Sequence, residues 1–391
     1  MGLYKLALAR KRYYNESQAD LPPEMQDQNI NQRAPGASKR VEPHLMGLKG
    51  IFAVQSLVWI YFATFIPALV YPGANGPVYQ RLLRDIFSVP FWNGSLISSF
   101  FVFLSLRTVG ITYLRKPSST TYAGTLVRRI IRMMLLLSIA SGIATGMVTS
   151  MGGGFVDEFK ARLPNNSFPT PGVPYNGIAA ANSIFDLFWL TTDFSTQAAN
   201  RFWPSATLWA PAVIYYESFT IYIIMVVMPY TRPAWHWQVL ALFALGSFWY
   251  QSWGWYAATA LALADAASNA TLSAEIKLGL KLRKGTRVPT WAVSALVFAI
   301  GLALKYFTTI VPRFEHSLLV LHPFLDLSQS QTPSTFAAQG PYPRLDDYLI
   351  IAGFFAAMES LDVIKKILSA RILVSIGERA FSESSQHPVV K

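Results

Sequence analysis

Few side chains in this chain could do acid–base chemistry, and the most distinctive is Glu217, which lies near the middle of an apolar stretch. An ionisable group at that depth in a membrane is costly, so it is expected to face the protein interior and mark a site or a cavity. A desolvated carboxylate there would suit a proton acceptor. The alternative is an ion pair between Glu217 and a basic residue that serves packing alone.

Three arginines, Arg128, Arg129 and Arg132, precede another apolar stretch. As the start of a helix they occupy the end where the helix dipole disfavours cations. Membrane topology alone would account for them. The functional alternative is a phosphate-binding group, because the guanidinium fork matches phosphate oxygens. Lys49, expected on the same cytosolic face, could join them.

Gln55 and Ser56 are the polar side chains in the middle of the first apolar stretch. Ser56 follows Lys49 by seven residues and therefore shares its helix face. Both are candidates for contacting a substrate, and hydrogen bonds between packed helices are the alternative. No phosphate-binding glycine loop and no Gly-x-Ser-x-Gly motif is present. No His residues are paired at the spacing of metal ligands, so no metal site is predicted. The five histidines are assigned to membrane edges, loops and the tail: His44, His236, His316, His322 and His387.

The composition decides the class of protein. Hydrophobic residues make up 52% of the 391 residues and charged residues only 14%, against about 25% charged in an average soluble domain. The net charge of +12 comes from Lys and Arg between apolar stretches. Topology and anionic lipid explain such a pattern better than nucleic acid does. We therefore predict an all-α, polytopic transmembrane helical bundle whose partner is the lipid bilayer.

The apolar stretches predict about eight membrane spans, each near the length of about 20 residues that a bilayer requires. A polar tail, residues 1–43, is expected to be disordered and cytosolic, and residues 383–391 form a second polar tail. The spans are expected at about 51–71, 92–106, 133–151, 206–228, two short crossings within 233–267, 290–310 and 348–364.

Basic clusters orient these spans by the positive-inside rule. Segments 107–132, 277–287 and 365–371 are rich in Lys and Arg. Placing all three in the cytosol requires both chain ends to be cytosolic as well. The sequon at Asn165-Asn166-Ser167 then lies on the opposite side, which predicts a glycoprotein.

The order of several short motifs resembles the acyltransferase-3 family of multi-pass membrane acyltransferases, in particular its fungal-type members. The resemblance covers residues 42–382, with 44–382 as the family-like domain. The chain differs from the family in its first span, where Ile60 replaces the family's His. It is also expected to lack the family's last spans. The motifs that carry it are Met46-Gly-Leu-Lys-Gly50, Ser98-Ser-Phe-Phe-Val-Phe-Leu-Ser105, Tyr122-Ala-Gly-Thr-Leu-Val-Arg-Arg-Ile-Ile-Arg132, Leu208-Trp209 with Glu217-Ser218, and Ser375-Ile-Gly-Glu-Arg-Ala-Phe-Ser382.

This resemblance implies transfer of an acyl group from acyl-CoA to a hydroxyl or amine of a small metabolite, sugar or lipid. Acyl-CoA would be a co-substrate, and no bound cofactor is expected. Glu217 and Lys49 are the catalytic candidates; Arg128, Arg129, Arg132, Gln55 and Ser56 are the substrate-binding candidates. Since isoleucine cannot accept a proton, any catalysis must use another residue than position 60.

Two other functions stay open from the sequence. The first is a catalytically inactive relative that keeps the helical bundle as a membrane binding or transport protein. The second is an ordinary solute transporter, which the lack of an internal repeat disfavours. The membrane that holds the protein, endomembrane or plasma membrane, is not distinguished by these features.

Overall fold

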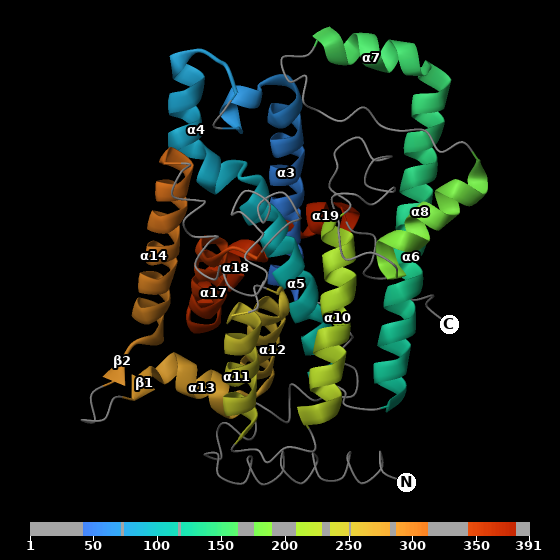
Figure 1. Cartoon of the computed structure of the whole chain (residues 1–391). Coiled ribbons are helices and arrows are strands. Elements are labelled where there is room, and N and C mark those ends of the chain that lie inside the picture. The colour runs from blue at the N-terminus through green and yellow to red at the C-terminus, as the bar shows by residue number, and fades with distance from the viewer. Residues whose placement is uncertain are drawn as a thin grey trace, which may run out of the picture.

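A computed structural model describes the chain over residues 42–71, 74–115, 119–162, 176–189, 209–228, 235–249, 252–281, 287–311 and 343–380. These residues are almost all helical, which confirms the predicted all-α class (Figure 1). The N-terminal tail, the sequon at Asn165 and residues 383–391 lie outside the described residues.

The first half of the described chain is a set of helices of uneven length. They are α3 (Pro43–Phe65), the 3-10 turn η1 (Pro67–Leu69), α4 (Val78–Phe91), α5 (Gly94–Arg115), α6 (Ser119–Met151), α7 (Gly153–Arg162) and α8 (Gly177–Trp189).

The second half adds further helices and one small hairpin, in which Leu280 pairs with Val288. These elements are α10 (Trp209–Val227), α11 (His236–Trp249), α12 (Gly254–Ser268), α13 (Ala270–Leu278), β1 (Leu280–Lys281), β2 (Arg287–Val288), α14 (Thr290–Ile310), α17 (Leu345–Ser360), α18 (Asp362–Leu368) and α19 (Arg371–Ala380).

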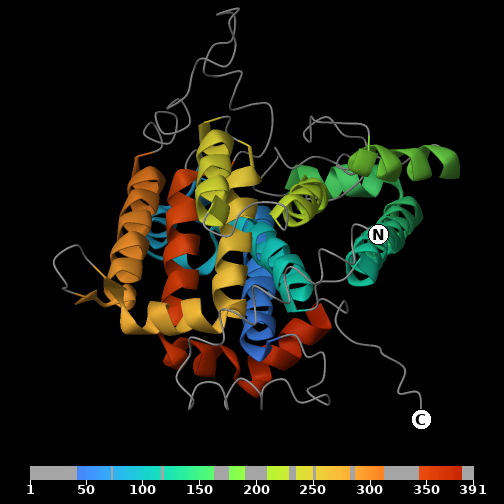
Figure 2. The ribbon, with the colours of Figure 1, turned by 90° about the horizontal axis from the view of Figure 1, so that it is seen from below.

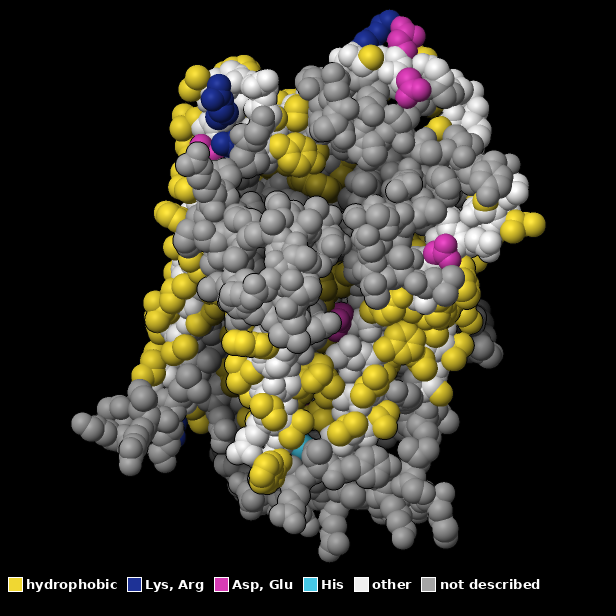
Figure 3. Space-filling view, in the orientation of Figure 1, with side chains coloured by type: hydrophobic (Ala, Val, Ile, Leu, Met, Phe, Trp, Pro, Cys, Tyr) yellow, Lys and Arg dark blue, Asp and Glu magenta, His cyan; other side chains and the backbone are white. Residues whose placement is uncertain are grey.

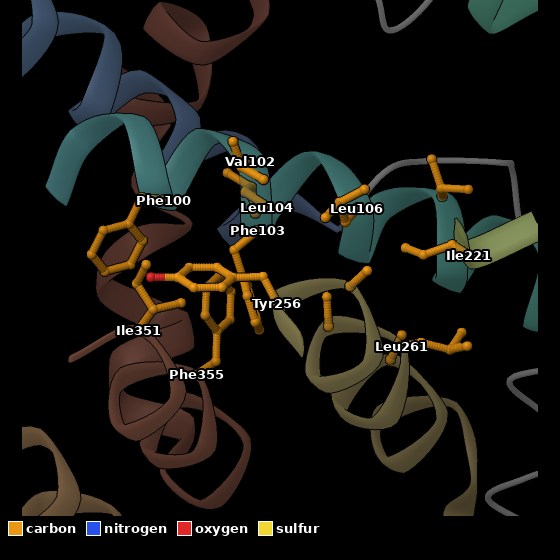
Figure 4. Packing of buried hydrophobic residues seen from close by; sticks show 14 of the residues in the cluster. Phe100, Val102, Phe103, Leu104, Leu106, Ile221, Tyr256, Leu261, Ile351 and Phe355 are labelled. Atoms are coloured by element: carbon orange, nitrogen blue, oxygen red, sulfur yellow. The ribbon is translucent and has the colours of Figure 1, made fainter. Parts of the chain in front are cut away.

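Helix α5 is the centre of the bundle and packs against α3, α10, α12 and α17. Its side chains Phe103 and Leu106 are fully buried. Figure 4 shows Phe103 meeting Tyr256 of α12 and Phe355 of α17, with ring centroids 6.4 Å and 4.8 Å from Phe103. Aromatic pairs at these separations stabilise a core beyond the area they bury.

Two helix pairs are drawn together at glycines. A Cβ added to Gly353 of α17 would lie 2.6 Å from the backbone nitrogen of Phe298 in α14. A Cβ on Gly50 of α3 or on Gly377 of α19 would likewise collide with backbone atoms of the other helix. Small residues allow helix backbones to approach closely, and this is a common device in membrane bundles. The motifs around Gly50 and Gly377 therefore pack against each other.

Helices α6, α7 and α8 stand to one side of this bundle (Figures 1 and 2). The most apolar part of α6 has no buried residues. A separate cluster that includes Met133, Phe188 and Tyr215 joins α6, α8 and α10. Such an exposed apolar helix is stable where lipid covers it.

Five helical segments of the described chain are long and apolar enough to cross a membrane, which supports a membrane protein. They are Pro43–Phe65, Val78–Thr112, Ala123–Met151, Ala210–Val227 and Thr290–Ile310. Helices α11, α12 and α17, which coincide with three further predicted spans, have 14, 15 and 16 residues. Figure 3 shows hydrophobic side chains over the lower flank of the molecule and charged ones at its upper end.

Two charged segments that lie between predicted spans are helical. The residues that precede the second predicted span form α4, with Arg84 buried and bonded to Asp85. Most of the basic segment 107–132 also belongs to α5 and α6. The first helix begins at Pro43 rather than about Ile51, because Pro is favoured in the first helical turn and residues 44–48 are buried.

Candidate functional site

Glu217 lies on the face of α10 that turns toward the main core. Residues four apart on a helix share a face, and Val213, Ile221 and Met225 are all buried in that core. The Thr220 side chain hydrogen-bonds to the Glu217 carboxylate. The Oε2 atom of Glu217 is buried and has no hydrogen-bond partner among the described residues. This orphaned carboxylate oxygen could accept a proton or a hydrogen bond from a ligand.

The ion pair required by the packing interpretation of Glu217 does not occur among the described residues. The ion pairs found there involve other acids, such as Glu359 and Asp347. Burial of a carboxylate without a cation is costly in a low-dielectric interior. Among the described residues, the Glu217 carboxylate thus has the Thr220 hydroxyl as a partner and no cation.

The three arginines of α6 do not act as one group. Arg129 donates from Nη2 to the Ser105 hydroxyl of α5 over 2.7 Å. Arg128 and Arg132 are exposed. Arg129 thus turns toward the bundle, whereas its neighbours lie where a ligand or lipid headgroup could reach them.

Helix α5 connects the two candidates. It packs against α10 and α6, and α10 also contacts α6. A Cβ on Gly110 of α5 would lie 3.8 Å from Met225 of α10. The structure therefore places the helices of Glu217 and Arg129 together around α5.

The candidates on α3 lie on other surfaces. Gln55 donates from Nε2 to the Pro90 carbonyl of α4 over 2.8 Å, the hydrogen bond between helices named above as its alternative role. Ser56 bonds to Ala53 of its own helix, also over 2.8 Å. Lys49 is half-buried. Nothing described here brings Gln55 or Ser56 to Glu217.

Sequence reasoning missed a buried ionic network between α14 and the start of α17. The Lys305 ammonium lies 2.6 Å from Asp347 and 3.4 Å from Asp346, and Arg344 reaches Asp346 at 3.0 Å. Ser99 donates to Asp347 over 3.2 Å, and Lys305 donates to Ser95 over 2.7 Å. We call this four-charge group, Lys305, Arg344, Asp346 and Asp347, the balanced network, since its cations and carboxylates are equal in number.

A second buried network joins α5, α17 and α18. Arg107 of α5 is fully buried and bonds to Glu359 of α17. Lys365 of α18 donates to the other oxygen of Glu359 over 2.7 Å. The guanidinium also lies over the Phe355 ring, 4.9 Å from its centroid. We call Arg107, Glu359 and Lys365 the unbalanced network, because two cations share one carboxylate.

The rule that singled out Glu217 could have found both networks. Lys305 and Glu359 also lie within apolar stretches, at 290–310 and 348–364. An ionisable side chain there needs a partner. The sequence alone does not say which partner, because the residues of each pair are far apart along the chain.

The described residues contain no group of three or more His, Asp or Glu side chains able to hold a metal ion. A scan against protein-family models and searches of curated proteins and solved structures find no match to this chain.

Proposed function

We propose that the chain is an integral membrane acyltransferase that moves an acyl group from acyl-CoA to a hydroxyl or amine of a small metabolite, sugar or lipid. The observation that carries this proposal is the Glu217 carboxylate, which is largely enclosed in a helical bundle with one oxygen unpartnered. A positioned carboxylate of this kind is a suitable general base. The ordered motifs of the sequence supply the class of reaction.

The proposed step balances without a further reagent. Glu217 takes the proton of the acceptor hydroxyl while the acceptor oxygen attacks the thioester carbonyl. The carbonyl-to-sulfur bond then breaks, and the coenzyme A thiolate leaves and takes up the proton. Cationic groups stabilise the developing oxyanion and the donor's phosphates. Lys49 and the arginines of α6 are the candidates for this role.

The second candidate function is a non-catalytic relative that binds or transports a small molecule. Ile60, in the position of the family's His, favours it, and so do the buried charges of both networks. Buried charges of this kind also line the pathways of transporters.

The test is acyl-CoA-dependent release of coenzyme A from membranes that contain the full chain. Glu217→Gln keeps the size of the side chain and removes the base. It is expected to lower the rate about 100-fold or more, the usual contribution of a general base. Glu378→Gln on α19, where the side chain is exposed, is the matched control and should leave the rate unchanged. Equal rates for wild type and Glu217→Gln, at equal membrane yield, would refute the role of Glu217.

The donor site is tested separately. Arg132→Ala is expected to raise KM for acyl-CoA with a smaller change in kcat, because it removes ground-state binding. Lys49→Ala is expected to lower kcat, because it removes a cation that stabilises the developing oxyanion. Transfer that survives both substitutions unchanged would refute this assignment. Uptake or binding of a metabolite without coenzyme A release, in wild type as well, would select the second candidate function.

A further inference from the structure

The unbalanced network carries one more cation than carboxylate. Glu359 Oε1 accepts from Arg107, and its Oε2 accepts from Lys365. Both oxygens of the single carboxylate are therefore in use. A net positive charge remains among side chains that are 0%, 6% and 28% exposed.

Arg107 also has hydrogen-bond donors left over. A guanidinium carries five N–H groups on three nitrogens. The Nε and Nη1 atoms of Arg107 are buried and have no hydrogen-bond partner in the part of the chain that the structure describes. Leaving such donors unsatisfied is costly, more so when they belong to a charged group. In Arg344 of the balanced network, by contrast, Nε and Nη2 both donate to Asp346.

A bound oxyanion would compensate both the excess positive charge and the unpartnered donors of Arg107. It would supply the missing negative charge, and several oxygens could accept from Arg107 and Lys365 at once. The planar guanidinium of Arg matches the oxygens of a phosphate, and the Lys ammonium adds a compact positive charge. Because Lys365 is only half-buried, a ligand could reach the site from the α18 side of the bundle.

The location suits a phosphate presented at the cytosolic surface. Figure 2 shows α13, α18 and α19 together at one edge of the bundle. Lys277 of α13 bonds to Asp362 of α18, so two clusters predicted to be cytosolic meet there.

We propose that Arg107 and Lys365 form a phosphate-binding site at the junction of α5, α17 and α18, with Glu359 as the group that orients both cations. The phosphate belongs to a nucleotide-type ligand or to a lipid headgroup. The site itself does not depend on acyl transfer. Only its use for the phosphates of coenzyme A rests on the proposed function.

The experiment measures the thermal unfolding midpoint of the purified full chain in detergent, followed by tryptophan fluorescence. Inorganic phosphate, coenzyme A and short-chain phosphatidic acid are titrated at constant ionic strength, because added salt alone screens charges. A ligand that binds only the folded state raises the midpoint, and the rise grows with the logarithm of the ligand concentration above the dissociation constant. A stronger response to coenzyme A assigns the phosphate to a nucleotide, and a stronger response to phosphatidic acid assigns it to a lipid.

Two neighbouring lysines provide a matched pair of variants. Lys365→Ala removes a ligand of the site and is expected to weaken phosphate binding about tenfold, the effect of one charge-assisted hydrogen bond. Lys366→Ala removes an exposed charge one residue away and should change binding less than about twofold. The double variant Arg107→Met/Glu359→Met, checked for its midpoint without ligand, should lose the response entirely.

The proposal is overturned if none of the three ligands raises the wild-type midpoint. It is also overturned if Lys365→Ala and Lys366→Ala lose the response equally, since that pattern describes general attraction to a basic surface. Coenzyme A release that persists in Lys365→Ala while phosphate binding is lost would leave acyl transfer standing and remove coenzyme A as the ligand of this site.

Discussion

The balanced and unbalanced networks both bury charged side chains, but they differ in how completely these charges are paired. In the balanced network Lys305, Asp346 and Asp347 are at most 2% exposed, and each carboxylate faces a cation. In the unbalanced network the fully buried Arg107 shares its one carboxylate with Lys365 and keeps unpartnered donors. Buried ion pairs contribute little net stability when complete, and breaking one leaves a costly lone charge. The first network therefore serves the fold, and the second has capacity for a ligand.

The largest expected effect comes from removing the cation of the balanced network. Lys305→Met leaves Asp346 and Asp347 with Arg344 alone, and an uncompensated buried charge costs about 3–5 kcal/mol. The free energy of unfolding in detergent, from denaturant titration, measures this loss. A cost below about 1 kcal/mol would show that the network is not complete in the folded protein.

A similar loss is expected when the carboxylate of the unbalanced network is removed. Glu359→Gln leaves the buried Arg107 and the half-buried Lys365 without a carboxylate and should cost about 3–5 kcal/mol. Arg107→Met leaves Glu359 paired with Lys365, so its cost should be smaller. The same titration compares them, and an Arg107→Met cost above that of Glu359→Gln would contradict the charge count.

A double-variant cycle measures the coupling between Arg107 and Glu359 in the unbalanced network. Arg107→Met and Glu359→Met together remove the pair, so the combined cost should fall below the sum of the single costs by about 1–3 kcal/mol. Strict additivity would mean that the two side chains do not interact in the folded state.

The smallest effect is expected at an exposed ion pair near the same end of the bundle. Lys277 and Asp362 lie 3.1 Å apart with side chains 47% and 73% exposed. Lys277→Ala should change the free energy of unfolding by about 0–1 kcal/mol. A loss as large as that of Lys305→Met would show that burial does not explain the difference between the networks.

The sequence predicted the kind of elements better than their ends. The apolar stretch 290–310 predicts both ends of α14, because Pro289 precedes it and polar residues follow it. The segment around Arg81 and Arg84, which lies between two predicted spans, is an amphipathic helix that packs on η1 and α14. The predicted total of about eight spans stays a prediction.

The residues of the candidate site also differ in how far the sequence alone predicts their surroundings. Glu217 could be selected from one residue and its neighbours, since a carboxylate within an apolar helix is rare for energetic reasons. Gln55 and Ser56 were selected by position along α3, but their partners depend on which helix lies beside α3. Arg107 begins a basic segment that is predicted to be cytosolic, and its burial follows from the approach of α17 to α5.

The composition alone indicates a helical membrane protein, because its share of charged residues is too low to form a water-facing surface around so many apolar residues. The cost of a charge within an apolar stretch applies to Glu217, Lys305 and Glu359, but it does not predict the burial of Arg107. Which of these charges meet depends on the packing of helices that are distant in the sequence. Arg107 and Glu359 are 252 residues apart, and Lys305 meets Asp347 only because α14 and α17 close on each other at Gly353. Ion pairing acts over a few ångströms, so the folded chain, and not its order of residues, sets where charge is left over for a ligand.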